Sequence, residues 1–114
     1  MKIESKNQGD IQILELSGEL DYHSSPELRE KLGELIGKQS PKILVDLSGV
    51  DYMDSSGIAT FVEAFQKTKR YQGRLILAAL TDTVRGVFEI AKLDSIFEIA
   101  PTVAEAVANL GPKS

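Results

Sequence analysis

Two kinds of apolar spacing alternate along this chain, and they restrict the fold that it can adopt. The short apolar run at residues 43–47 is typical of a strand buried on both faces, as in a parallel sheet. Beyond residue 57, apolar side chains recur three and four positions apart, which predicts an amphipathic helix. The residues of its expected buried face are Ile58, Phe61, Val62 and Phe65. A buried strand followed by such a helix is the repeating unit of α/β proteins.

The N-terminal third predicts an antiparallel hairpin at the edge of the sheet, followed by a helix. Residues 2–6 and 11–17 have strand patterns, and turn-forming residues separate them. Apolar residues then recur at helical spacing as far as Gly37. We expect Ser25 to be the N-cap of this helix, because the next residue, Pro26, is favoured at the first helical position.

The C-terminal half continues the alternation of strands and helices. Residues 75–80 predict a buried strand, and residues 96–97 predict a short last strand. Thr81 and Thr102 are expected to cap the two remaining helices. The expected inward-facing residues are Val84, Val87, Phe88 and Ala91 in the first of these, and Val103, Ala106, Val107 and Leu110 in the second. This order predicts an α/β fold with a mixed four- to five-stranded sheet, an antiparallel N-terminal edge hairpin and about four helices.

Length and composition limit the classes of function. The 114 residues suffice for one apolar core, so we expect a single domain over residues 1–114. The chain has no cysteine and one histidine, His23, and we expect neither a metal site nor a cofactor. A formal net charge of −4 argues against nucleic acid as a partner. No stretch approaches the ~20 apolar residues of a membrane span, and the start lacks the apolar core of a signal peptide. We therefore expect a cytoplasmic protein with no membrane insertion.

The tetrapeptide Asp54-Ser55-Ser56-Gly57 stands where the buried strand gives way to the helix. Serine and aspartate are favoured N-caps, so one interpretation is that these residues only begin the helix. A second interpretation is phosphorylation, because a phosphate on such a serine would meet free N–H groups and the positive end of the helix dipole. The tetrapeptide alone leaves both interpretations open.

Three motifs make the chain resemble a known family. They are Leu-Ser-Gly-Glu-Leu-Asp at residues 16–21, Val-Asp-Leu-Ser-Gly-Val-Asp-Tyr-Met at residues 45–53 and Asp-Ser-Ser-Gly-Ile at residues 54–58. Together they resemble the STAS domain, and within it the single-domain bacterial anti-sigma factor antagonists, over nearly the whole chain. One departure is Ala59, where such proteins often have a second glycine. Alanine is the better helix former, so we expect a stiffer first turn and an intact acceptor serine.

The resemblance implies a phosphorylation switch at Ser55. In that family the first serine after the aspartate is phosphorylated by a partner kinase that doubles as an anti-sigma factor, and Ser56 would be a cap or a neighbour. The unmodified form would bind the anti-sigma factor and free the sigma factor, whereas the phosphorylated form would be released until a phosphatase acts. The chain itself would not be an enzyme. The expected partner-binding residues are Asp21, Tyr22, His23, Met53, Asp54, Ser55, Ser56 and Gly57.

Two other functions remain open. The chain could be a STAS interaction module of another assembly, such as a stress-signalling complex or a lipid-transport machine, that docks constitutively through the same turn. It could instead be a small phosphate-handling enzyme, although the sequence has no Gly-x-Ser-x-Gly elbow and no Walker-type loop. Asp46, Asp51 and Asp54 could gather near one strand end and attract a cation, but such single carboxylates are more often solvated or capping.

Overall fold

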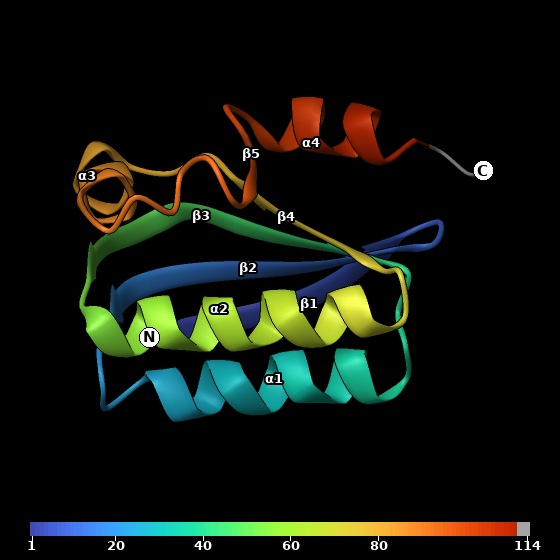
Figure 1. The fold of residues 1–114 in the computed structure, drawn as a ribbon, viewed down its shortest axis with the longest axis horizontal. Coiled ribbons are helices and arrows are strands. Elements are labelled where there is room, and N and C mark those ends of the chain that lie inside the picture. Colours follow the sequence, from blue (N-terminus) through green and yellow to red (C-terminus); the bar gives the residue numbers. More distant parts are fainter. Residues whose placement is uncertain (112–114) are drawn as a thin grey trace.

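The computed structural model of the protein describes residues 1–111, and nine regular elements lie within them (Figure 1). They are β1 (Lys2–Gln8), β2 (Ile11–Leu20), α1 (Ser25–Gly37), β3 (Lys42–Met53), α2 (Ser55–Arg70), β4 (Arg74–Ala78), α3 (Asp82–Ile90), β5 (Glu98–Ala100) and α4 (Val103–Leu110). The order of strands and helices is the one predicted from the sequence.

The strands form one mixed five-stranded sheet in the order β1-β2-β3-β4-β5. β1 pairs antiparallel with β2 at one edge of the sheet, and each later strand pairs parallel with the one before it. The carboxyl ends of β2, β3 and β4 therefore lie at the same edge of the sheet, and α1, α2 and α3 begin just beyond that edge. The predicted fold class, with its edge hairpin and four helices, is confirmed.

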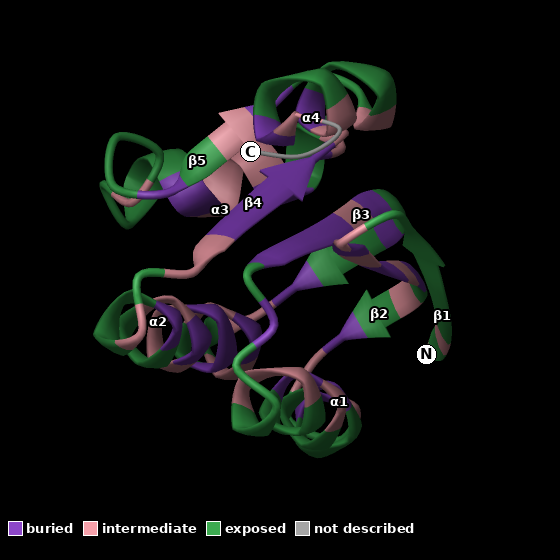
Figure 2. Ribbon diagram, turned by 90° about the vertical axis from the view of Figure 1, so that its right-hand side faces the viewer, coloured by how far each residue is buried: buried purple, intermediate pink, exposed green. Residues whose placement is uncertain are grey.

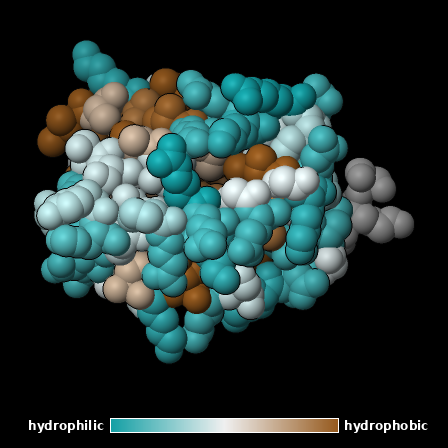
Figure 3. Space-filling view, turned by 90° about the horizontal axis from the view of Figure 1, so that it is seen from below, coloured by the Kyte–Doolittle hydropathy of each residue, from teal (hydrophilic) through white to brown (hydrophobic). Residues whose placement is uncertain are grey.

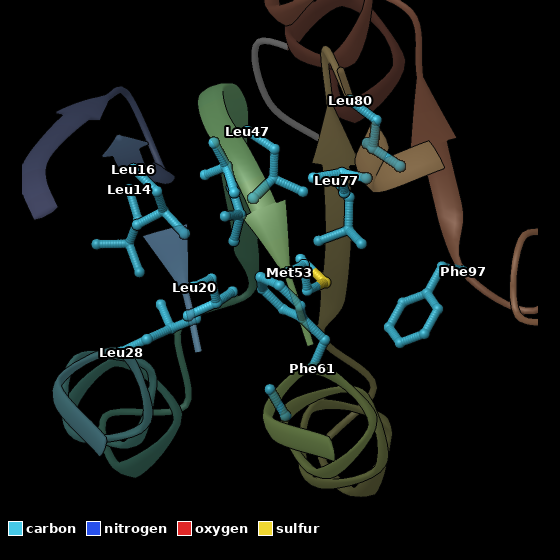
Figure 4. Close-up of a cluster of buried hydrophobic side chains, with 14 of the residues drawn as sticks. Leu14, Leu16, Leu20, Leu28, Leu47, Met53, Phe61, Leu77, Leu80 and Phe97 are labelled. Carbon is cyan, nitrogen blue, oxygen red and sulfur yellow. The ribbon is translucent and has the colours of Figure 1, made fainter. Parts of the chain in front are cut away.

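Helices cover both faces of the sheet (Figures 1 and 2). α1 and α2 run side by side along one face, and α4 lies over the other. The larger core fills the space between the sheet, α1 and α2, and it includes Leu20, Leu28 and Phe61 (Figure 4). Two buried residues of α3, Val84 and Phe88, belong to the same core. A smaller core lies under α4 and consists of Ile11, Ile13, Leu44, Ile76, Ala78, Ala100, Ala106 and Leu110.

The predicted helix caps are confirmed at two helices and wrong at a third. The hydroxyl oxygens of Thr81 and Thr102 accept backbone hydrogen bonds at the starts of α3 and α4. At α1 the N-cap is Ser24, and Ser25 is already the first helical residue. The hydroxyl of Ser24 donates to the Glu19 carbonyl at 2.8 Å, so this side chain is held by the loop before the helix. The prediction was one residue late because the loop, and not the proline, sets where the helix begins.

Strand boundaries also differ from the prediction, most of all at β3 and at the last strand. β3 continues past residue 47 as far as Met53, with irregular pairing to β2 near its end. The last strand begins at Glu98 and not at residues 96–97. Phe97 instead packs in the core, with ring centroids 5.1 Å from Phe65 and 5.5 Å from Phe88. Packing of this ring holds the chain in a turn, and pairing with β4 starts only after it.

The third helix buries fewer residues than its periodicity predicted. Val84 and Phe88 of α3 are buried, whereas Val87 is only partly buried. Ala91 is exposed because α3 ends at Ile90 and Ala91 is its C-cap. The inward-facing expectation for Ala91 was therefore wrong.

The buried face of α2 is rotated relative to the predicted one. Its buried residues are Gly57, Thr60, Phe61, Ala64 and Thr68. Phe61 is fully buried as predicted, whereas Ile58, Val62 and Phe65 are only partly buried. The small residues on the true inner face let the helix lie close to its neighbours, and this brings its bulkier apolar residues to the side. Hydrophobic spacing alone does not report such close packing.

Candidate functional site

The two segments that carry the predicted site residues lie next to each other at the carboxyl edge of the sheet. Leu20 ends β2, Met53 ends β3, and the two residues are direct partners in the parallel ladder. The loop 21–24 follows the first strand and the turn 54–57 follows the second, so both extend from the same place (Figure 1). The amide of Asp54 also donates a hydrogen bond of 3.1 Å to the carbonyl of Leu20.

Asp54 is the residue that caps α2. Its backbone is extended, and its carboxylate accepts a 2.9 Å hydrogen bond from the amide of Ser56. The two serines are therefore not needed as caps, and Ser56 is not the N-cap of α2. Ser55 is the first residue of α2 and is exposed. Its hydroxyl makes no hydrogen bond within the described residues 1–111.

Gly57 and Met53 are buried beneath this exposed serine. A Cβ atom added to Gly57 would lie 2.8 Å from Cγ of Met53 and 2.9 Å from Cγ of Leu20, distances that real Cβ atoms do not adopt. The missing side chain lets the first turn of α2 approach the ends of β2 and β3 closely. Among the residues expected to bind a partner, these two are buried, and the others are at least partly exposed.

The loop after β2 is held rigid by the carboxylate of Asp21. One oxygen of this group accepts from the amides of His23 at 3.0 Å and Ser24 at 3.1 Å. The hydrogen bond from the Ser24 amide is the main reason that the pKa of Asp21 lies below its usual value, and the His23 amide adds to the effect. A short loop with such bonds presents its side chains in a fixed arrangement.

That loop presents two aromatic rings to solvent. The side chain of Tyr22 is 66% exposed, and its ring lies against the imidazole of His23 with a centroid distance of 4.2 Å. A third ring, Tyr52, lies near the end of β3 and is 47% exposed. Exposed tyrosines with fixed backbones are frequent anchors in protein interfaces. The edge around Ser55 thus has features of a surface that binds another protein.

The same edge is rich in carboxylates. Glu19, Asp21 and Glu27 line an open polar hollow together with Met1, His23 and Ser24. No group of three or more metal-ligating side chains is arranged to hold a metal ion in the part of the chain that the structure describes. Of the three aspartates considered for a cation, Asp46 accepts from the amide of Ser48 and Asp54 caps α2, so both have structural partners.

Comparison with known proteins relates this arrangement to a family. A model of the STAS domain matches residues 2–106. The chain belongs to the STAS domain family. An anti-sigma-B factor antagonist of Listeria monocytogenes is 33% identical over 109 residues, which cover 96% of this chain and 95% of that protein. The anti-sigma-B factor antagonist of Bacillus subtilis is 38% identical over 95 residues, with 83% and 85% covered. The family resemblance inferred from the motifs is confirmed.

Solved structures of STAS domains have the same fold. An anti-sigma factor antagonist from Mycobacterium paratuberculosis superimposes with a TM-score of 0.88 at 22% identity, covering 95% of this chain and 92% of that one. SpoIIAA in its unphosphorylated form gives a TM-score of 0.84 at 24% identity and covers 99% of each chain. The Bacillus SpoIIAA structure in the phosphorylated form gives 0.76 at 24% identity, with 96% and 99% covered.

Three residues around the turn at residues 54–57 and the loop 21–24 were not predicted as part of the site. The hydroxyl of Ser24 makes hydrogen bonds across the loop after β2. The sequence signal for this residue was the pair of serines before Pro26. Arg29 of α1 and Glu63 of α2 form an ion pair of 2.7 Å about two turns into α2. They are far apart in the sequence, and no local pattern connects them.

In the described part of the chain, no helix has the length and apolarity to cross a membrane.

Proposed function

We propose that this STAS domain is an anti-sigma factor antagonist that binds an anti-sigma factor when Ser55 is unmodified and is released when Ser55 is phosphorylated. The observation that carries the proposal is the exposed Ser55 hydroxyl, which has no partner within residues 1–111 and opens a helix that Asp54 already caps. Such a serine is free to react without loss of the helix cap. The names of the curated relatives support the same role.

The domain can accept a phosphate at Ser55 and remain folded. A phosphoserine carries about −1.5 to −2 charges at pH 7, and these charges would lie at the positive end of the α2 dipole. Free N–H groups in the first turn of a helix are natural donors to phosphate oxygens. Asp54 adds some repulsion, but its carboxylate is turned to the amide of Ser56. The modification would thus change the surface and leave the core intact.

A bound partner would not accept the phosphate. Ser55 lies beside the rigid loop 21–24 with its exposed rings, so a protein docked on both segments would cover the serine. A buried phosphate adds bulk and must lose its hydration, which costs several kcal/mol when it finds no cationic partner. A loss of only ~1.4 kcal/mol weakens binding tenfold. Phosphorylation would therefore release the partner.

The chemistry of the switch would come from other proteins. In this proposal the anti-sigma factor is also the serine kinase that transfers the phosphoryl group from ATP, and a separate phosphatase restores Ser55. The chain supplies the acceptor and the docking surface and is itself no enzyme. Sigma factors act on transcription, so the exchange of partners would take place in the cytoplasm. SpoIIAA, which has the same fold, has been solved in unphosphorylated and phosphorylated forms.

Reconstitution with candidate partners from the same genome tests the proposal. Each anti-sigma factor with a kinase domain would be mixed with the protein, with and without ATP, and complexes would be followed by size-exclusion chromatography. We expect a complex without ATP, its loss after ATP is added, and one phosphate on Ser55 by tandem mass spectrometry. The Ser55→Ala variant should keep the complex in ATP. A complex that persists in ATP with unmodified Ser55 would indicate constitutive docking in another assembly instead.

A further inference from the structure

The two serines of the acceptor turn face different surroundings. Ser55 is exposed, whereas Ser56 is half-buried and lines a groove between α1 and α2. The helices run side by side here, and the face that they form is mainly hydrophilic (Figures 1 and 3). The other residues that line this part of the groove are Ser25 and Arg29 from α1, and Ala59, Thr60 and Glu63 from α2.

An ion pair crosses the groove about two turns of α2 beyond Ser56. Nη2 of Arg29 lies 2.7 Å from one carboxylate oxygen of Glu63, and Nζ of Lys67 lies 2.8 Å from the other. Both cations lower the pKa of Glu63, Lys67 more than Arg29, so this carboxylate stays charged at neutral pH. Arg29, Glu63 and Lys67 also line the next part of the groove. The other residues that line this part include Leu32, Gly33, Ile36 and Ala64. The Arg29–Glu63 pair therefore spans from one helix to the other.

The backbone of Ser56 is fixed as well. Its amide donates to Asp54, and its carbonyl accepts a 2.9 Å hydrogen bond from the hydroxyl of Thr60. These two bonds hold the backbone of Ser56 in place beside the groove. Phosphoryl transfer needs the attacking hydroxyl in line with the leaving oxygen of ATP, with free space around it for the γ-phosphate. Ser25 and Arg29 of α1 line the same groove as Ser56, whereas Ser55 is exposed and is not among the residues that line it.

We propose that Arg29, through its bridge to Glu63, restricts phosphoryl transfer to Ser55 by narrowing the α1–α2 groove that Ser56 lines. This inference rests on the proposed function, because it concerns the selectivity of the same kinase. Arg29 acts here as a positioning residue, and it touches neither ATP nor the reacting hydroxyl. The Asp-Ser-Ser motif by itself would offer two equivalent hydroxyls, and the neighbouring helix makes them different.

Labelling by the partner kinase gives the first test. Wild type should carry phosphate only on Ser55, and Ser55→Ala should carry none. In the double variant Ser55→Ala with Arg29→Ala, phosphate should appear on Ser56. In the double variant Ser55→Ala with Arg29→Lys, Ser56 should again carry no phosphate. Glu34→Ala on the exposed side of α1 is the matched control and should leave Ser55→Ala unlabelled. Labelling of Ser56 while Arg29 is intact, or no labelling of Ser56 after Arg29→Ala, would overturn the inference and leave the function standing.

Thiol reactivity gives a second test that needs no kinase. The chain has no cysteine, so the variants Ser55→Cys and Ser56→Cys each contain one reactive group. The rate of alkylation by iodoacetamide would be measured over a range of pH, so that the two variants can be compared as fully deprotonated thiolates. The thiolate of Ser55→Cys should react at least about tenfold faster than that of Ser56→Cys. Arg29→Ala should raise the rate of Ser56→Cys severalfold and leave Ser55→Cys unchanged. Equal alkylation rates for the two thiols would overturn the inference, whatever the kinase does. A wild-type protein that the kinase does not label would instead count against the proposed function.

Discussion

The amide of Asp54 donates a hydrogen bond of 3.1 Å to the carbonyl of Leu20, and this bond joins the two segments of the candidate site. Leu20 and Met53 are partners at the ends of adjacent parallel strands, so the loop after β2 and the turn after β3 cannot move independently. Ser55 is thereby held at a fixed place relative to the rings of Tyr22 and His23. A modification at Ser55 can then affect a partner that contacts both segments, with no change of fold.

Replacing Gly57 by alanine should destabilise the domain by about 1–3 kcal/mol, because the new Cβ would overlap Met53 and Leu20 in the core. Urea unfolding followed by circular dichroism would measure the change. The matched control is Gly33→Ala in α1, where an added Cβ meets nothing within 4 Å. Alanine favours a helix, so this control should stabilise by about 0.5–1 kcal/mol. Equal effects of the two substitutions would show that close packing at Gly57 is unimportant.

The rotation of α2 predicts different costs for two phenylalanines. Phe61→Ala should cost about 3–5 kcal/mol because its ring is fully buried among core residues. Phe65→Ala should cost clearly less, since that ring is partly buried and lies under the ammonium group of Lys69 at 5.3 Å. Denaturant midpoints of the two variants, measured side by side, would check the order. A larger loss for Phe65→Ala would contradict the observed orientation of the helix.

The difference between these phenylalanines illustrates what the sequence could predict. Element order, the edge hairpin and the threonine caps of α3 and α4 depend on local spacing and local hydrogen bonds, and they were predicted correctly. The orientation of α2 depends on the contact of Gly57 with Leu20, a residue more than thirty positions away. No periodicity within the helix contains that information.

The candidate site divides in the same way. The turn at residues 54–57 and the loop 21–24 could be found from motifs, because each is a continuous segment that directly follows a strand. The different surroundings of Ser55 and Ser56 could not, because they depend on the packing of α1 beside α2. A contact between side chains of two helices is set by how those helices pack together, and only the folded structure reveals it.

The lowered pKa of Asp21 predicts a stabilising contribution that is lost in acid. A carboxyl group whose pKa is lower in the folded protein stabilises the fold above its unfolded pKa, and this contribution disappears as pH falls through the folded value. The loss should therefore occur below about pH 4. NMR titration of the side-chain carboxyl would report the pKa directly. Asp21→Asn should remove this part of the acid dependence, and an unchanged dependence would contradict the assignment.

The capping role of Asp54 predicts that the neighbouring serine is dispensable for stability. Asp54→Ala should cost about 0.5–2 kcal/mol, because the amide of Ser56 loses its acceptor. Ser55→Ala should change the free energy of unfolding by no more than about 0.5 kcal/mol, because its exposed hydroxyl makes no bond within residues 1–111. Thermal or urea unfolding would compare the two variants. A large loss for Ser55→Ala would mean that this hydroxyl helps to hold the helix.

Negative charge at Ser55 should weaken partner binding without unfolding the domain. Ser55→Asp and Ser55→Glu place a carboxylate at the N-terminus of α2, where the helix dipole favours it, so circular dichroism should show a folded protein. Against a docked anti-sigma factor the same charge must be desolvated, and we expect calorimetric affinity to fall by at least about tenfold. Phosphate carries more charge and more acceptor oxygens, so these variants should reproduce its effect only in part.

The control for this experiment is Ser55→Asn, which has nearly the size of Ser55→Asp and no charge. If charge drives release, Ser55→Asn should bind more tightly than Ser55→Asp, and raising the salt concentration should narrow the difference because it screens exposed charges. If bulk alone drives release, the two variants should bind equally weakly. Affinity equal to or above that of wild type in the folded Asp and Glu variants would argue against release by phosphorylation and in favour of constitutive docking through the turn at residues 54–57.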